Sequence, residues 1–271
     1  MSAIPNKPVG DHPMQRALVV GGSGFVGRAL PNDITHVFVP FGTINPEQCA
    51  RDPAGTRITN VDSVIRVLED AFAAGLLPIF VSSDYVYDGS KPLRIEDEPQ
   101  APNTEYGRQK VAVERWLGTR HEPWLVTRLS KVVSGDTTAQ GILGPWISDI
   151  RNGRAMRSAT DQIFSPALVD DLAGAMIRLA EMNLHGIYHV AGPETMSRYD
   201  LNRLLVEAVR AVDPRVDPLL ESCSLRDIPS LELRPLNTSL SIEKMQAAIA
   251  WRFMPMVDLV RGIAQEWFSQ A

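Results

Sequence analysis

A glycine-rich turn directly after a short apolar run is the feature that most constrains how this chain can fold. The apolar run at 17–20 predicts a buried strand, and the sequence GGSGFVG follows it at 21–27. Glycines let the backbone turn tightly and approach a pyrophosphate, and the following helix N-terminus offers free N–H groups. We therefore expect Gly21, Gly24 and Gly27 to bind a nucleotide phosphate; the alternative is a plain strand-to-helix turn.

Strand and helix patterns alternate along the first half. Apolar runs predict strands at 34–40, 78–81 and 124–129, and helical periodicity predicts helices at 61–72 and 104–117. This alternation is typical of a parallel sheet covered on both faces. We predict an α/β, Rossmann-like doubly wound parallel sheet at 16–160 after a flexible leader at 1–15. A smaller C-terminal α/β lobe, mainly 161–271, is expected to bind substrate, with the chain free to cross between lobes. Its predicted elements are helices at 167–181, 198–212, 241–251 and 257–268 and a strand at 186–190.

The nucleotide-binding half is unusually short. Residues 28–33 alone separate the last turn glycine from the strand at 34–40, and the next strand already carries a serine motif. The usual strands 2 and 3 are therefore predicted to be missing, with the first strand left as an edge beside 34–40. Strand 2 normally ends with the residue that recognises the adenine ribose. Glu47 stands at about the right distance from Gly27 but follows the wrong strand, so we expect weak or atypical dinucleotide binding.

Tyr106 and Lys110 are four residues apart, which places them on one face of a helix. An ammonium group near a phenol stabilises the phenolate and lowers a pKa that is otherwise ~10. Such a hydroxyl can protonate a carbonyl oxygen while a hydride reaches the carbon. Ser83 ends a predicted strand, at the edge where open α/β sheets place their sites, and its hydroxyl can donate to the same oxygen.

These motifs resemble the extended short-chain dehydrogenase/reductase superfamily and, within it, the dTDP-4-dehydrorhamnose reductase family. The resemblance runs from about residue 16 to 268 and rests on GGSGFVG (21–27), SSDYVYDG (82–89), YGRQK (106–110), DQIFSP (161–166), GIYHVAG (186–192) and RPLNTSL (234–240). It implies that Ser83 is the catalytic Ser or Thr, that Tyr106 donates the proton, and that Lys110 lowers the pKa of Tyr106 and holds the nicotinamide ribose. It also implies substrate-binding roles for four residues, Asp84, Tyr85, Arg234 and Asn237.

The function expected from this resemblance is NAD(P)-dependent reduction of a keto-sugar nucleotide or related carbonyl, with NADPH or NADH as cofactor. Two alternatives stay open. The first is a non-catalytic regulatory or nucleotide-binding protein, which the shortened nucleotide-binding half favours. The second is an epimerase or dehydratase on the same scaffold. Dehydratases of the superfamily usually carry an Asp-Glu pair after the Ser or Thr, whereas Asp84 and Tyr85 follow Ser83 here, which favours a reductase.

The composition of the chain limits the classes of partner that it can bind. The 271 residues carry a net charge of −5, so a bulk basic surface for nucleic acid or anionic membrane is not expected. No apolar run approaches the roughly 18 residues that a spanning helix needs. Cys49 and Cys223 have no metal-ligand spacing, so we expect no metal site. Few cysteines and no secretory signal predict a cytoplasmic protein with a small-molecule substrate, and a homodimer is one assembly open to it.

Overall fold

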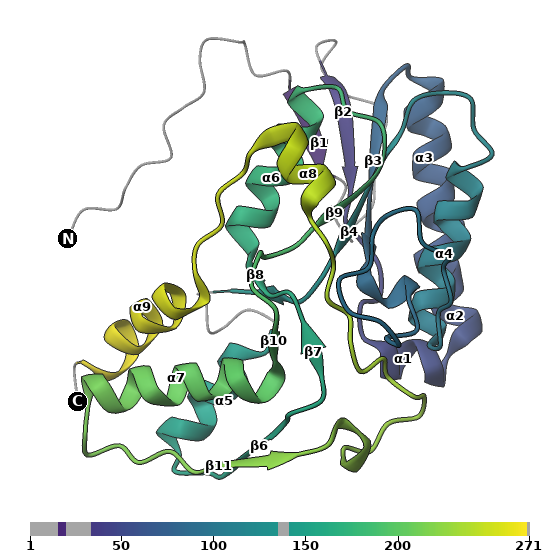
Figure 1. Cartoon of the computed structure of the whole chain (residues 1–271). Helices are drawn as coiled ribbons and strands as arrows, with labels where there is room; N and C mark the ends of the chain where they lie inside the picture. The colour runs from purple at the N-terminus through teal and green to yellow at the C-terminus, as the bar shows by residue number, and fades with distance from the viewer. Residues whose placement is uncertain (1–15, 20–33, 135–140, 270–271) are drawn as a thin grey trace.

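A parallel sheet forms the centre of the molecule. The computed structural model describes residues 16–19, 34–134 and 141–269. Its main sheet has five strands in the order β1-β2-β3-β4-β9, and every neighbouring pair is parallel (Figure 1). The strands are β1 (Arg16–Val19), β2 (Ile34–Val39), β3 (Leu77–Ser83), β4 (Leu125–Leu129) and β9 (Gly186–Val190). The predicted Rossmann-like α/β class is confirmed.

The first strand lies at an edge of this sheet. Among the described residues, β1 pairs with β2 alone, and β2 then pairs directly with β3. The side chain of Val19 is 64% exposed, as expected for an edge. In the usual Rossmann strand order 3-2-1-4, strands 2 and 3 lie beyond the outer edge of the first strand. No described strand pairs with that edge of β1, which is the arrangement predicted for a sheet without strands 2 and 3.

Helices cover both faces because residues of the strands alternate between them. Val37 and Val39 of β2 face α3 (Ser63–Ala73) and α4 (Glu105–Leu117), whereas Phe38 faces the opposite side. That side is covered by α6 (Val169–Glu181) and α8 (Glu243–Ile249). Burying these apolar side chains contributes about 1.5–3 kcal/mol each, which ties the helices to the sheet.

Two short helices and a wider turn connect β2 to α3. They are α1 (Pro46–Arg51), α2 (Pro53–Arg57) and the π-helical turn η1 (Ile58–Asp62). Asn45 caps α1 and Asp52 caps α2, each through its side-chain oxygen, and a proline begins each helix. After β3, the chain makes the 3₁₀ turn η2 (Asp84–Val86) before it enters α4.

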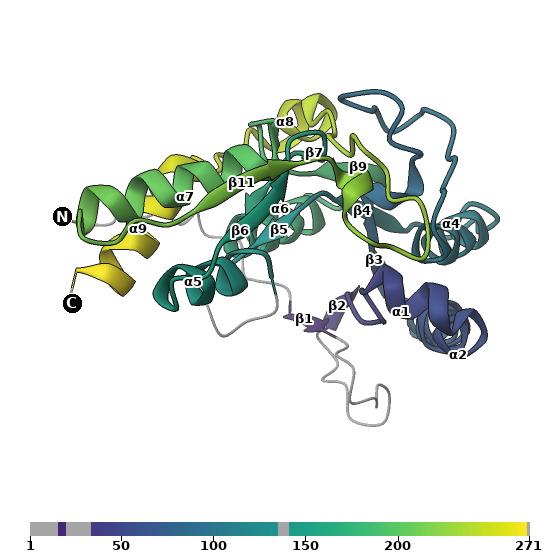
Figure 2. The same cartoon turned by 90° about the horizontal axis from the view of Figure 1, so that it is seen from below.

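A second hydrophobic cluster lies beside the sheet (Figures 1 and 2). It is built around α5 (Leu143–Arg151), α7 (Arg198–Val212) and α9 (Met256–Phe268). Its small strand pairs are β6 (Met156–Ala159) with β11 (Leu220–Cys223), β7 (Ile163–Phe164) with β10 (Met196–Ser197), and β5 (Val132–Val133) with β8 (Ala167–Leu168); the 3₁₀ turn η3 (Leu225–Asp227) follows β11.

The chain passes between the main sheet and the second hydrophobic cluster more than once. It leaves the sheet after β4, returns through α6 and β9, leaves at β10, and returns at α8 before α9. The elements α5 and β6 precede residue 161 and yet pack with α7, so the division into 16–160 and 161–271 stays a prediction. No helix in the described ranges is long and apolar enough to cross a membrane.

Candidate active site

The carboxyl end of β3 brings Ser83 and Tyr106 to one place. The Ser83 hydroxyl oxygen accepts a hydrogen bond from the Tyr85 backbone N–H at 3.2 Å, which starts η2. Helix α4 then begins beside this turn, capped by Thr104. A Cβ at Gly107 would overlap the Tyr85 carbonyl oxygen, so only glycine lets the helix approach so closely. As a result, the Tyr106 ring packs edge-on against the Tyr85 ring, with centroids 5.8 Å apart.

Lys110 lies one turn along α4, on the same side as Tyr106. Its ammonium group donates to the Val81 carbonyl at 2.8 Å and lies 4.7 Å from the centroid of the Phe80 ring. The same ammonium is 5.8 Å from the centroid of the Tyr106 ring. Burial lowers the pKa of Lys110 to about 8, and the Glu114 carboxylate opposes that shift. The predicted pairing of Tyr106 with Lys110 on one helix face is therefore present in the structure.

Tyr106 keeps its proton at neutral pH. Burial raises its pKa, and a hydrogen bond with Ser83 opposes that rise. Desolvation of the phenolate is the largest cause of that rise. That Lys110 lowers the pKa of Tyr106 stays a prediction. A protonated phenol is the form that a proton donor requires.

Asp84 holds the Ser83 hydroxyl. Its carboxylate accepts a hydrogen bond from the Ser83 hydroxyl at 2.9 Å and from the Ser130 hydroxyl at 3.3 Å. Burial raises the pKa of Asp84, and burial likewise raises the pKa of Tyr85 to about 12. Because Ser83 donates its proton to Asp84 and accepts from the Tyr85 N–H, its oxygen has one lone pair left to accept from Tyr106.

Arg234 approaches the site from the C-terminal segment, where Glu47 binds it. The Arg234 guanidinium is 2.9 Å from the Glu47 carboxylate. Glu47 also accepts from the Ser230 hydroxyl at 2.6 Å and from the Leu231 N–H at 3.3 Å. Hydrogen bonds from Ser230 and Arg234 lower the pKa of Glu47 to about 2. Glu47, which its sequence position made unsuitable for ribose recognition, thus anchors this segment to α1.

Asn237 forms a turn next to the site. Its side-chain oxygen accepts from the Ser239 hydroxyl at 2.7 Å and from the Ser239 N–H at 3.1 Å. Its own N–H donates to the Gly89 carbonyl at 3.2 Å. Gly89 has φ +77°, and a Cβ there would meet Pro235. The contacts found for Asn237 are within the protein, and its role toward a substrate stays a prediction.

Asn60 is a buried residue that the sequence analysis missed. Its amide nitrogen donates to the Thr43 carbonyl at 3.0 Å and to the Gln109 side chain at 2.7 Å. Its oxygen accepts from the Thr43 N–H at 2.6 Å. Asn60 therefore ties the loop after β2 to α4, the helix of Tyr106. The only sequence signal was an amide just before an apolar helix pattern.

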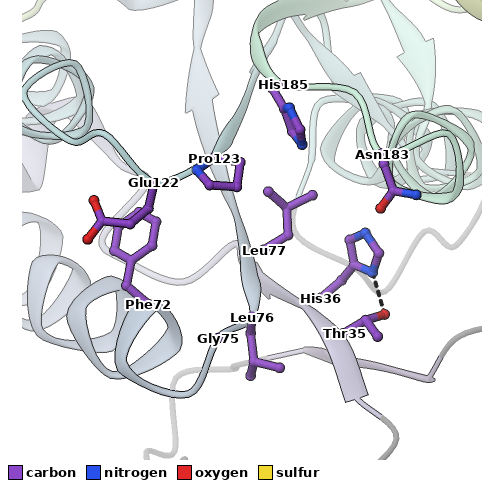
Figure 3. Close-up of a pocket in the computed structure, with 10 residues that line it drawn as sticks. All are labelled: Thr35, His36, Phe72, Gly75, Leu76, Leu77, Glu122, Pro123, Asn183 and His185. Carbon is purple, nitrogen blue, oxygen red and sulfur yellow. Dashed lines mark hydrogen bonds between the residues drawn. The ribbon is translucent and has the colours of Figure 1, made fainter.

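A cavity of about 380 Å³ lies at the opposite end of the sheet (Figure 3). Its lining includes Thr35 and His36 at the start of β2, Leu77 at the start of β3, and His185 just before β9. These are the amino ends of the strands, whereas α/β sheets place catalysis at the carboxyl ends. The cavity is thus separate from Ser83, Tyr106 and Lys110.

One end of a nicotinamide dinucleotide fits the described residues. An ammonium group has three donors, and among the described residues the Lys110 ammonium has one hydrogen bond, to Val81. The remaining donors suit ribose hydroxyls at the carboxyl end of β3. Gly21, Gly24 and Gly27, predicted to hold the pyrophosphate, lie outside the described residues. Within the described ranges, no group of three His, Cys, Asp or Glu could hold a metal ion.

A parallel sheet that carries Ser, Tyr and Lys beside the end of β3 defines an α/β protein of the extended short-chain dehydrogenase/reductase type. Within that class, the chain belongs to the RmlD substrate binding domain family, whose sequence model matches residues 43–265. The resemblance inferred from the motifs is confirmed.

Curated relatives fall into two groups. The chain is 26% identical to a dTDP-4-dehydrorhamnose reductase of Aggregatibacter actinomycetemcomitans, covering 87% of this chain and 93% of the relative. It is 28% identical to the methionine adenosyltransferase 2 subunit beta of Xenopus tropicalis, covering 74% and 61%. One group is therefore named as reductases and the other as a subunit of a different enzyme.

Solved structures agree on the fold. A dTDP-4-dehydrorhamnose reductase of Clostridium acetobutylicum has a TM-score of 0.77 at 17% identity, covering 86% of this chain and 81% of the other. The corresponding reductase of Bacillus anthracis, solved in complex with NADP, has a TM-score of 0.76 at 19% identity with the same coverage. The Rossmann-like architecture with its second lobe is shared with both.

Proposed function

We propose that this protein is an NAD(P)-dependent reductase of a carbonyl group on a sugar nucleotide. The observation that carries the proposal is the grouping of Ser83, Tyr106 and Lys110 at the carboxyl end of β3. Membership of the RmlD substrate binding domain family supports it, as do relatives named as dTDP-4-dehydrorhamnose reductases.

The residues of the chain divide the work of carbonyl reduction. A bound nicotinamide cofactor supplies the hydride. The Tyr106 phenol donates its proton to the carbonyl oxygen, which would otherwise carry the negative charge. The Ser83 hydroxyl turns from Asp84 to the same oxygen and positions it. The Lys110 ammonium, held by the Val81 carbonyl, stabilises the phenolate that remains on Tyr106.

The substrate we propose is a dTDP-linked 4-keto sugar, the class named by the reductase relatives. Asp84 and Tyr85 line the proposed sugar site beside Ser83, and Arg234 and Asn237 approach it from the C-terminal segment. We further propose weak cofactor binding with little discrimination between NADPH and NADH, because the strand that normally recognises the adenine ribose has no counterpart on the outer edge of β1 in the described sheet.

A non-redox binding role is the second candidate. It is favoured by the relatives named as methionine adenosyltransferase 2 subunit beta. In that role the same site would bind a nucleotide or sugar nucleotide without turnover, and the partner enzyme would carry the chemistry.

Incubation of the purified protein with dTDP-4-dehydrorhamnose and NADPH or NADH separates these candidates. We expect oxidation of the nicotinamide, followed by absorbance, and a product two hydrogens heavier by mass spectrometry. Oxidation should depend on both the sugar nucleotide and the cofactor. Binding of either molecule without any oxidation would contradict the reductase and favour the binding role.

A further inference from the structure

Three positively charged residues lie close to the short strand β7 in the fold. Lys131 follows β4, Arg198 begins α7, and Arg234 lies in the C-terminal segment. The Lys131 ammonium is 5.9 Å from the centroid of the Phe164 ring in β7. On the other side, β10 pairs with β7 and leads directly into Arg198.

The C-terminal segment meets the same strand. The Thr238 N–H donates to the Ile163 carbonyl at 2.8 Å, and the Ile163 N–H donates to the Leu236 carbonyl at 2.7 Å. Arg234 therefore enters close to β7 as well. Residues 131, 198 and 234 are far apart in sequence, and the fold gathers them at one place.

Two of these three cations have no ionic partner among the described residues. Arg234 pairs with Glu47, but no carboxylate of the described chain forms an ion pair with Lys131 or Arg198. The Arg198 guanidinium lies over the Trp146 ring, 5.3 Å from its centroid. Its Nε atom is buried without a hydrogen-bond partner. Unpaired, partly buried charges are costly unless a ligand compensates them.

The charges of the three cations also affect the pKa values of Lys131 and Arg198. Burial lowers the pKa of Arg198, and the charge of Arg234 lowers it further. Burial also lowers the pKa of Lys131, where Asp84 opposes the shift and both arginines add to it. Asp84 is the nearby carboxylate, and it already accepts hydrogen bonds from Ser83 and Ser130. A negatively charged ligand would stabilise Lys131 and Arg198, which form no ion pair within the described ranges.

The cluster lies on the Tyr85 side of the catalytic group. The charges of Arg234 and Arg198 both act on the Tyr85 phenol, and the Tyr85 ring packs against Tyr106. An anion bound there would sit next to a carbonyl presented to Tyr106. Guanidinium groups match phosphate oxygens with paired hydrogen bonds, and lysine adds a point charge.

We propose that Lys131 and Arg198 are specificity-determining residues that bind a phosphate-class anionic group of the substrate, with Arg234 as a third contact. The inference rests on the proposed function, since it states which part of the substrate these residues recognise. A sugar-linked diphosphate and a free nucleotide diphosphate present the same chemistry at this site.

Calorimetric titration with thymidine diphosphate, thymidine and inorganic pyrophosphate tests the proposal. We expect the wild-type protein to bind thymidine diphosphate more tightly than thymidine. Arg198→Gln and Lys131→Gln should each weaken the diphosphate by about tenfold or more, the effect of losing one charged hydrogen bond. Affinity for NADPH should not change. The matched control is Arg203→Gln, an exposed arginine on the same helix that pairs with Glu207.

Thermal unfolding gives an independent measure. Inorganic pyrophosphate should raise the unfolding temperature of the wild-type protein and of Arg203→Gln. It should raise the unfolding temperature of Arg198→Gln much less. Equal diphosphate affinity in the wild-type protein and both variants would overturn the proposal, as would a wild-type protein that prefers thymidine. Diphosphate binding without hydride transfer would instead contradict the reductase while leaving this anion site intact.

Discussion

At the scale of single residues, the phenol of Tyr106 is the group on which the proposed chemistry depends. Tyr106→Phe removes one hydroxyl from a buried ring that packs against Tyr85, so the fold should survive. A general acid contributes about 10²–10⁴-fold to a rate, and carbonyl reduction should fall by that factor. Steady-state turnover measures the loss.

The matched control for that substitution is Tyr188→Phe. Tyr188 is also a buried tyrosine, but it packs on the sheet face covered by α6 and α8. It should retain turnover. Near-wild-type reduction by Tyr106→Phe would show that another group donates the proton.

Lys110 predicts the pH dependence of the reaction. Its pKa is about 8 in the folded protein, so the ammonium is charged below that pH and neutral above it. Because the charged form stabilises the Tyr106 phenolate, turnover should decline as the pH rises through about 8. The Lys110→Arg side chain stays charged in this pH range. The turnover of this variant should therefore not decline as the pH rises, even if its rate is lower at every pH. A wild-type rate that stays constant well above this range would refute the role of the ammonium.

The lowered pKa of Lys110 also determines how this residue changes the stability of the protein with pH. The pKa of Lys110 is lower in the folded chain than the ~10.4 of an unfolded lysine. Between these two values the unfolded chain binds more protons, so this residue makes the protein more stable as the pH rises. Below both values, the folded protein carries the cost of a buried ammonium, which the proposed catalytic role of Lys110 would explain.

The sequence could predict the grouping of Ser83, Tyr106 and Lys110, because helix periodicity and strand ends determine it. It could not predict that burial raises the pKa of Tyr106, since desolvation depends on tertiary packing. Nor could it single out Lys131 and Arg198, which become neighbours only through the pairing of β7 with β10. The spacing of residues along the sequence predicts which side chains share a helix face or a strand end. It does not predict burial or contacts between distant segments.

At the scale of elements, a buried ion pair fixes α4 against the sheet. Glu114 of α4, one turn after Lys110, lies 2.7 Å from Arg128 of β4, and both side chains are 2% exposed. Glu114→Gln would leave Arg128 charged and unpaired in the core. Breaking a buried pair in this way costs about 3–5 kcal/mol, and urea unfolding should show a loss of that size.

A double variant tests whether the loss of stability comes from the unpaired charge of Arg128. In Glu114→Gln combined with Arg128→Met, no buried charge remains at the site, so most of the lost stability should return. If Glu114→Gln alone unfolds at the wild-type urea concentration, the pair does not hold α4 in place.

The segment at 230–234 makes a different prediction. Arg234→Ala removes a partly exposed ion pair with Glu47, and such pairs contribute only about 0–1 kcal/mol to stability. A charged hydrogen bond to a ligand is worth about 1.5–3 kcal/mol, so affinity for a sugar nucleotide should fall by about 10- to 150-fold. Nicotinamide affinity should stay nearly unchanged. Calorimetry that shows a loss of nicotinamide affinity with unchanged sugar-nucleotide affinity would reassign Arg234 to the cofactor. The control is Arg210→Ala, which removes an exposed arginine paired with Asp217.

Long, strongly periodic elements were predictable, and short ones were not. The predicted helix at 104–117 corresponds to α4, and the strand at 186–190 coincides with β9. By contrast, α1 and α2 were missed, because five or six residues between prolines show no helical period. Their positions depend on side-chain caps and on Asn60, which binds Thr43 and Gln109.

At the scale of the whole molecule, the sheet carries both the edge strand β1 and the proposed active site. Strand β1 pairs with β2 alone among the described strands, while Ser83, Tyr106 and Lys110 lie together at the end of β3. Strand order was predictable, because losing two outer strands leaves a contiguous sheet. The passage of the chain between two hydrophobic clusters was predictable only in outline, since no sequence pattern marks α5 as part of the second cluster.

The central claim is that this shortened half still supports hydride transfer to a carbonyl. The direct test uses NADPH or NADH deuterated at the transferable position, together with dTDP-4-dehydrorhamnose, and mass spectrometry of the sugar product. We predict that deuterium appears on the former carbonyl carbon with either cofactor, that the two cofactors differ little in efficiency, and that Tyr106→Phe slows the transfer by about 10²–10⁴-fold. A product without deuterium, or no product with either cofactor at saturating concentration, would contradict the claim.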